Sequence, residues 1–211
     1  MKLAWSDDFN GKEVDETKWN IRNRNPGSVK IVDGILRLEL LPGKEPGFWQ
    51  STGVDTQNKF TQAYGYFEAS MKMLQTTGRS GRFEVRHTPK EEPPSARLVY
   101  NSVGNDNIVL TGQMADNTGI RNFNPPKPPL NFDGGTSYKR WHTYGFYWTP
   151  KYFEWYVDGK KVFRVDRPET PTKPMYLEIV HHTPEGGELK DFKDPNNGPE
   201  PLMIDWVKVW K

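Results

Sequence analysis

The sequence contains no cysteine, which excludes disulfides, thiolate metal sites and a cysteine nucleophile. It also lacks an apolar run long enough to span a membrane, and no Lys/Arg cluster is interleaved with aromatic residues. The formal net charge is only +2, so no broad electrostatic attraction to nucleic acid or to a membrane surface is expected. We therefore expect neither a nucleic-acid nor a membrane partner, and we expect a monomer.

Aromatic residues, glycine and proline are plentiful: the 211 residues include 8 Trp, 9 Tyr, 11 Phe, 19 Gly and 18 Pro. The aromatic side chains supply core volume, so the many Gly and Pro residues indicate turns rather than disorder. A β-sandwich of this length commonly forms one unit. We expect a single domain over residues 1–211.

Alternating apolar and polar residues predict strands along the whole chain. Two hairpins are the clearest, because the Asp-Gly pairs at 33–34 and 158–159 accept positive φ between β-branched runs. Gly, Pro and β-branched residues interrupt every candidate helix. Many short strands without helices indicate an all-β sandwich or jelly roll. Residues 117–139 and 183–200 are rich in Pro and Gly and are predicted as loops, either surface connections or cleft walls.

Four blocks of sequence resemble family 16 of the glycoside hydrolases, the laminarinase, lichenase, agarase and carrageenase group: WSDDFNGKEVDETKWN, AYGYFEASMKM, WHTYGFYWTPKYFEWYVDGKKV and MIDWVKVW. They occur in the family's order and are spread over nearly the whole chain. The resemblance implies a concanavalin A-like β-jelly roll of two curved antiparallel sheets, whose concave face binds a polysaccharide. It also implies an extracellular or periplasmic protein. The opening MKLAWSDDFNG is not a signal peptide, so either a leader was removed or the protein is cytoplasmic.

The strand that carries the family's catalytic Glu-x-Asp-x-Glu pattern corresponds here to ARLVYNSVGND. Alternate residues share one face of a strand, and retaining hydrolysis uses two carboxyl groups about 5 Å apart. Alignment on the following glycine places Arg97, Val99 and Asn101 at the three positions. A bulged version of the pattern places Ala96, Leu98 and Asn101 there. Neither alignment supplies a carboxylate, so we expect little or no hydrolysis by the usual mechanism.

The preceding strand, SGRFEVRH, carries a row of charges in which Arg82, Glu84 and Arg86 alternate with apolar residues. This row is either a solvated charge ladder or part of a cleft, where arginine would bind a carboxylate or a sulfate. If the row faces the cleft, Arg97 joins it, and three close guanidinium groups that Glu84 offsets only in part favour an acidic ligand. A register shift of one residue would turn the row outward instead.

Other polar residues are expected on the same face. In PMYLEIVHH, Glu178 and His182 share the face opposite the apolar residues, and both depart from the family. Together with Glu84 they are the candidate acid and base groups. The remaining candidates for ligand binding have aromatic or amide side chains suited to sugars; they are Trp49, Asn101 and Gln113.

These residues leave three hypotheses open. The first is a carbohydrate-binding protein on a family 16 scaffold. The second is an enzyme with altered chemistry, either hydrolysis or β-elimination, that uses Glu84, Glu178 and His182; RFEVR and GQM are similar to elements of alginate-lyase-type jelly rolls. The third is a cleft that was rebuilt by engineering.

The resemblance also implies a structural calcium ion on the convex side. Its carboxylate ligand would be Asp205 in the final MIDWVKVW, and backbone carbonyl oxygens would complete the site, since calcium prefers oxygen ligands. The four histidines show no His-x-x-x-His spacing, so no other metal site and no cofactor for chemistry is expected.

Overall fold

The computed structural model describes residues 1–45, 48–74, 80–87, 95–102, 108–116, 119–123, 140–167, 170–183 and 200–211. Throughout these ranges the secondary structure is β, without a helix, and no helix there could span a membrane. The strands in chain order are β1 (Leu3–Asp7), β2 (Asn20–Arg22), β3 (Val29–Val32), β4 (Ile35–Leu38), β5 (Leu41–Pro42), β6 (Trp49–Gln50), β7 (Thr52–Asp55), β8 (Gly65–Lys72), β9 (Ser80–Arg86), β10 (Ser95–Ser102), β11 (Ile108–Asp116), β12 (Gly119–Phe123), β13 (His142–Trp148), β14 (Tyr152–Val157), β15 (Lys160–Asp166), β16 (Tyr176–His182) and β17 (Leu202–Trp210).

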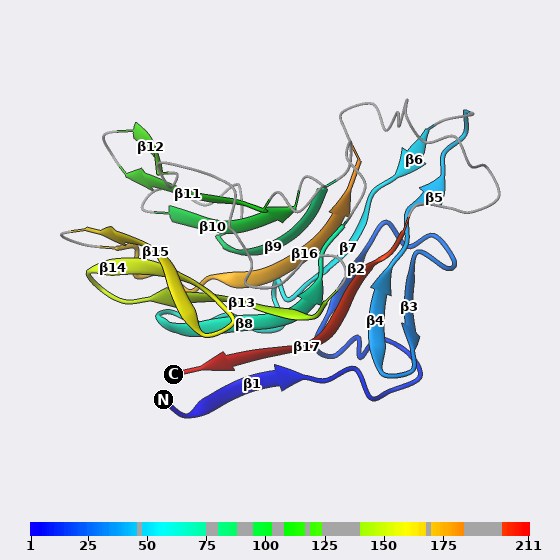
Figure 1. The fold of residues 1–211 in the computed structure, drawn as a ribbon, viewed down its shortest axis with the longest axis horizontal. Helices are drawn as coiled ribbons and strands as arrows, with labels where there is room; N and C mark the ends of the chain where they lie inside the picture. Colours follow the sequence, from blue (N-terminus) through cyan, green and yellow to red (C-terminus); the bar gives the residue numbers. More distant parts are fainter. Residues whose placement is uncertain are drawn as a thin grey trace.

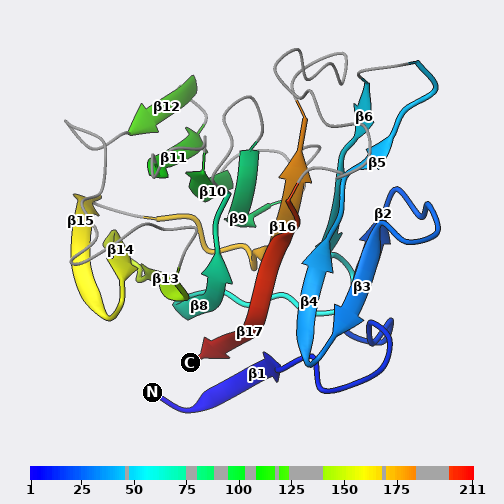
Figure 2. The ribbon, with the colours of Figure 1, turned by 45° about the vertical axis from the view of Figure 1, so that its right-hand side comes forward.

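The strands form two antiparallel sheets that pack face to face. One sheet has the order β15-β14-β13-β8-β17-β4-β3, with β1 added beside β17, and the other has the order β12-β11-β10-β9-β16-β7-β2. The strands β5 and β6 form a separate two-stranded ribbon. The second sheet curves above the first in Figure 1, and the turned view in Figure 2 brings β4 and β3 of the first sheet forward. This architecture confirms the all-β sandwich of two antiparallel sheets.

Both predicted hairpins are confirmed, and one predicted loop is partly wrong. Asp33 and Asp158 have φ values of 52° and 48° at the turns that join β3 to β4 and β14 to β15. Within the predicted loop 117–139, residues 119–123 instead form β12, which pairs with β11. Such a short edge strand is held by backbone hydrogen bonds and lacks a clear apolar alternation. Residues 124–139 and 184–199 lie outside the described part of the chain.

The hydrophobic core fills the space between the two sheets. Phe83 of β9 packs against Phe146 of the opposite sheet, with ring centroids 5.2 Å apart. Tyr100 of β10 is also buried, and its hydroxyl donates to the backbone carbonyls of Gly145 and Tyr156, at 2.9 and 2.6 Å. These contacts direct one face of β9 and β10 into the core, so the alternate residues of both strands must occupy the outward face of their sheet.

Candidate ligand-binding site

The outward face of the second sheet, which we call the concave face, carries the charged row predicted in β9. Phe83 and Val85 are fully buried in the core. Because side chains alternate along a strand, Arg82, Glu84 and Arg86 point to the opposite side. The sheet curves toward this side in Figure 1. Phe83 and Val85 thus take the core side as expected, and the charged row lies on the opposite, curved face of the sheet; that this face forms a ligand-binding cleft stays a prediction.

The neighbouring strand β10 adds a further arginine to this face. Arg97 lies directly opposite Arg86 in the antiparallel pairing of β10 with β9. The alternative register, shifted by one residue, is therefore wrong. Asn101 lies opposite Arg82, while its side chain falls outside the described part of the structure.

Three carboxylates lie side by side across the concave face. Glu178 of β16 is the cross-strand neighbour of both Asp55 in β7 and Glu84 in β9. Asp55, Glu178 and Glu84 are 4%, 2% and 1% exposed. Adjacent strands are about 4.8 Å apart, so three ionised carboxylates in this row would repel one another unless cations lie between them.

Arginines of β9 and β10 neutralise two of these carboxylates. Arg97 binds Glu84 through two hydrogen bonds, Nε to Oε2 at 2.8 Å and Nη2 to Oε1 at 2.6 Å, and the hydrogen bonding raises the pKa of Arg97. Arg86 bridges the row, because its Nη1 is 3.1 Å from Oε2 of Glu178 and 3.6 Å from Oε2 of Glu84. Each guanidinium thus compensates a buried negative charge.

The other end of the network was missed by sequence reasoning. Arg22 of β2 pairs with Glu178 through Nη1 and with Asp55 through Nε, which is 3.1 Å from Oδ2. Asn20 donates to Oδ1 of Asp55 at 2.8 Å. In the sequence, Asn20 and Arg22 alternate within a short polar segment, which indicates that they share one face of a strand. This pattern does not indicate which carboxylates they contact.

Arg82 is the least compensated arginine on the concave face. Its Nη1 is 3.8 Å from Glu84 Oε1, and its Nε donates to Ser80 Oγ at 3.0 Å. Burial lowers the pKa of Arg82, Glu84 opposes this effect, and Arg97 and Arg86 reinforce it. The expectation of three poorly compensated guanidinium groups needs correction, because Arg86 and Arg97 are paired with buried carboxylates. Among the described side chains of this face, the positive charge that remains lies at Arg82.

His182 lies on the same face as Arg82, at the end of β16. Burial lowers the pKa of His182, and the charge of Arg82 lowers it further. Its Nδ1 is 3.2 Å from the hydroxyl of Ser51. Trp49 lies in β6, two residues before Ser51, and is partly exposed. The ribbon of β5 and β6 stands beyond the β7–β2 edge of the sheet in Figure 1.

The opposite end of the concave face is hollowed into a polar cavity of about 290 Å³. It is lined by Arg97, Val99, Thr111, Gly112, Gln113 and Asn122. Gln113 is exposed and donates from Nε2 to Oδ1 of Asn122 at 3.0 Å. Amide and hydroxyl groups that line a cavity can exchange hydrogen bonds with sugar hydroxyls.

Tyr176 provides a polar group next to the charged network. It lies opposite Arg86 in the pairing of β16 with β9 and is 3% exposed. Burial raises the pKa of Tyr176, so its hydroxyl stays protonated. That hydroxyl is buried and has no hydrogen-bond partner among the described residues.

Of the candidate acid and base groups, Glu84 and Glu178 lie side by side, whereas His182 lies four residues further along β16, opposite Ser80. Arginines bind both carboxylates. Glu84 is held by Arg97, and Glu178 is held by Arg22 and Arg86. A general acid or base must reach the reacting atoms of its substrate, and these carboxylates are almost fully buried. The geometry favours a structural role for both. Strand β10 has the sequence SARLVYNS and therefore carries no carboxylate.

Asp205, the residue predicted to bind calcium, lies in β17 at an irregularity in its pairing with β8. Its Oδ2 accepts a hydrogen bond of 3.5 Å from the hydroxyl of Ser70. This long contact leaves lone pairs on a partly exposed carboxylate, which fits a single carboxylate ligand. Among the described residues, no group of three or more His, Asp or Glu side chains could hold a metal ion, so backbone oxygens would have to complete the site.

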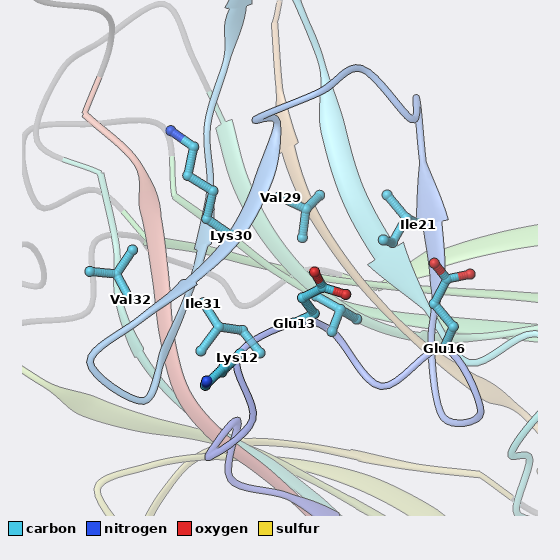
Figure 3. Close-up of a pocket in the computed structure, with 9 residues that line it drawn as sticks. Lys12, Glu13, Glu16, Ile21, Val29, Lys30, Ile31 and Val32 are labelled. Carbon is cyan, nitrogen blue, oxygen red and sulfur yellow. The ribbon is translucent and has the colours of Figure 1, made fainter.

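A second cavity, of about 400 Å³, lies away from the predicted site residues. Figure 3 shows apolar side chains around it, those of Ile21, Val29 and Ile31. Its charged lining residues, Lys12, Glu13, Glu16 and Lys30, include two of each sign. The cavity therefore has no net charge that would select an ionic ligand.

Comparison with known proteins relates this chain to carbohydrate-active enzymes. The sequence model described as "Glycosyl hydrolases family 16" matches residues 13–208. A β-glucanase from Acetivibrio thermocellus is 33% identical over 191 residues, which are 87% of this chain and 52% of the relative. A xylanase/β-glucanase from Ruminococcus flavefaciens is 31% identical over 210 residues, 94% of this chain and 24% of the relative. The chain thus spans about a quarter to a half of these relatives.

Solved structures confirm the jelly-roll fold. The catalytic domain of an endo-1,3-β-glucanase (laminarinase) from Thermotoga petrophila superposes with a TM-score of 0.75 at 17% identity. The match covers 100% of this chain and 97% of that domain. At such low identity the likeness concerns the fold alone.

We predict that Arg86→Met lowers the free energy of unfolding by about 2–4 kcal/mol, because two buried carboxylates lose their shared cation. Urea denaturation, monitored by tryptophan fluorescence, measures this change in the free energy of unfolding. The matched control is Arg24→Met, which removes an exposed ion pair with Glu16 and should leave stability almost unchanged. Equal losses in the two variants would contradict a stabilising role for the network.

The calcium site stays a prediction. If Asp205 holds a calcium ion, a chelator should lower the melting temperature of the wild type, and Asp205→Asn should remove that response. Differential scanning calorimetry with and without chelator makes the measurement. A melting temperature that is unchanged at every chelator concentration would contradict the prediction.

Proposed function

The chain belongs to family 16 of the glycoside hydrolases, and we propose that it binds a polysaccharide along its concave face without cleaving it by the retaining mechanism. The observation that carries this proposal is the ion-pair network of the concave face. Its three carboxylates are bound by arginines. Strand β10, where the family carries its catalytic carboxylates, has no Asp or Glu. We also propose that the protein acts outside the cytoplasm, since a polysaccharide does not cross a membrane unaided. We propose further that it acts as a monomer.

The rest of the concave face supports sugar binding. Gln113 and Asn122 border the polar cavity, which Thr111 and Arg97 also line. Arg22, Arg86 and Arg97 are already held by ion pairs, so little of their side-chain entropy is lost when a ligand binds. Trp49 at the other end supplies an aromatic ring that could stack on a sugar.

An acidic substituent on the polysaccharide would form an ion pair with Arg82. Its pKa and that of the nearby His182 are both lowered, in each case first by burial. A carboxylate or sulfate bound between them would offset the cost of burying positive charge, and arginine binds such groups with paired hydrogen bonds. We therefore propose a uronate or a sulfated sugar as the ligand.

The altered-chemistry hypothesis has less support. Glu84 and Glu178 would each have to leave their arginines before they could transfer a proton, and breaking such a buried pair costs about 3–5 kcal/mol. His182 remains accessible, but a single base without an acid does not complete either hydrolysis or β-elimination.

We predict no release of reducing sugar from laminarin, lichenan or agarose, and no ultraviolet absorbance from unsaturated products. The wild type is compared with Glu84→Gln and Glu178→Gln in the same assay. Turnover by the wild type that either substitution abolishes would establish the altered chemistry instead. Turnover that survives both would contradict the binding proposal and those two acid/base candidates together.

A companion variant tests whether the scaffold retains its catalytic geometry. It combines Arg97→Glu, Val99→Asp and Asn101→Glu with Glu84→Gln, because the new Glu at position 97 would otherwise face an unpaired Glu84. We expect β-glucanase activity in this combination. The same three substitutions without Glu84→Gln should be less stable, since they bring uncompensated carboxylates together.

We predict that an acidic hexasaccharide such as oligogalacturonate binds more weakly as salt rises, because salt screens the attraction to Arg82. Arg82→Ala should weaken binding about tenfold, as expected for a lost charge-assisted hydrogen bond, whereas Lys30→Ala on β3 should not. Isothermal titration calorimetry measures both. Binding that responds neither to salt nor to Arg82→Ala would contradict an acidic ligand at this site.

The same complex has a pH signature. The pKa of His182 is lowered from 6.5 in the free protein, and a bound anion would raise it. The complex would then take up protons, so affinity should increase as the pH falls through the range below 6.5. A titration of His182 by NMR, with and without the hexasaccharide, shows the shift directly.

A further inference from the structure

The outward face of the other sheet, which we call the outer face, carries a row of aromatic side chains. Tyr147 of β13, Tyr66 of β8 and Trp210 of β17 are direct cross-strand neighbours. The ring centroid of Tyr66 is 6.4 Å from that of Tyr147 and 5.6 Å from that of Trp210. All three side chains are partly exposed. Three adjacent strands therefore present an aromatic strip about 10 Å long.

Tyr66 lies across the neighbouring strand β13. A Cβ atom on Gly145 would be 2.2 Å from Oη and 2.6 Å from Cζ of Tyr66, so the ring occupies the space that a side chain at position 145 would fill. The hydroxyl donates to Oε1 of Glu68 at 2.9 Å. Tyr156 stands against it at 89°, with centroids 5.6 Å apart. Tyr66 thus forms a platform with Tyr156 as its wall.

Charged groups surround the platform, but their charges balance. Glu154 is bound by Lys161 at 3.1 Å and by Arg164 at 2.9 Å. Lys208 lies opposite Glu68 in the pairing of β17 with β8, and its Nζ is 4.2 Å from the ring centroid of Trp206. Such a surface offers hydrogen bonds without selecting an ion, in contrast to the concave face with its surplus charge at Arg82.

We propose that the outer face is a second saccharide-binding site, which takes a neutral β-linked glucan chain. A β-linked glucose ring carries its hydroxyls around the edge and exposes apolar C–H groups on both faces, so it can stack on Tyr66. Trp210 and Tyr147 contact the chain on either side. Glu68 and Lys208 lie where they can bind hydroxyls at the ring edge. The strip spans roughly two sugar rings.

The probe is the neutral hexasaccharide of mixed-linkage β-1,3-1,4-glucan, titrated by calorimetry at low and high salt. We expect Tyr66→Ala to weaken binding about tenfold, the effect of one lost aromatic contact. Gly145→Ala keeps every aromatic residue but displaces the Tyr66 ring, and should weaken binding similarly. Tyr66→Phe keeps the platform and should bind within about twofold of the wild type. The affinity should not change with salt.

Three results would overturn this proposal. The first is that Tyr66→Ala and Gly145→Ala bind the hexasaccharide as tightly as the wild type, in variants whose unfolding transitions match that of the wild type. Another is an indole NMR signal of Trp210, assigned with Trp210→Phe, that does not move in the wild type at saturating hexasaccharide. The third is a dimer in sedimentation that Tyr66→Ala dissociates, which would assign the outer face to a second copy of the chain. Failure of the acidic site is seen separately, in Arg82→Ala.

Discussion

Three carboxylates on adjacent strands can be buried only if cations neutralise them, and this requirement organises the concave face. Removing an ion from water costs several kcal/mol even in a relaxed protein. Asp55, Glu178 and Glu84 therefore each contact at least one guanidinium. Arg86 is central because it bridges two of them. The network connects β2, β7, β16, β9 and β10, so the charges that shape the site also hold its strands together.

This network also limits what the protein can do. Carboxylates that neutralise arginines are not free to act as acid, base or nucleophile, so the same contacts that stabilise the sheet oppose catalysis. Replacement of Arg97 by glutamate would remove the partner of Glu84. A change that restores a catalytic carboxylate at this position would therefore also affect stability. For the ligand that we propose, the described residues of the concave face offer the charge at Arg82 and the neutral polar groups of the cavity near Gln113.

The two outward faces differ in chemistry although both follow from strand alternation. On the concave face, β9 carries a row of three charged residues and β16 adds Glu178, and burial lowers the pKa values of Arg82 and His182. On the outer face, β8, β13 and β17 each contribute one aromatic side chain to a strip, and balanced charges surround it. Gly145 makes the second arrangement possible, because a larger residue would displace Tyr66. One jelly roll thus presents an ionic surface and an aromatic surface on opposite sides.

Local pattern was enough to predict the hairpins at Asp33 and Asp158, the all-β class and the direction of the Arg82–Arg86 row, because turn chemistry and period-two alternation involve residues close in sequence. The absence of carboxylates from β10 is likewise a property of the sequence alone. The partners of the charges depended on tertiary structure: Arg22 meets Glu178 across 156 positions of the chain, and no local pattern encodes such a contact. For the same reason the sequence overestimated the uncompensated charge at Arg86 and Arg97 and missed the edge strand β12. Cross-strand pairing decides which charges meet, and that pairing exists only once the sheets have formed.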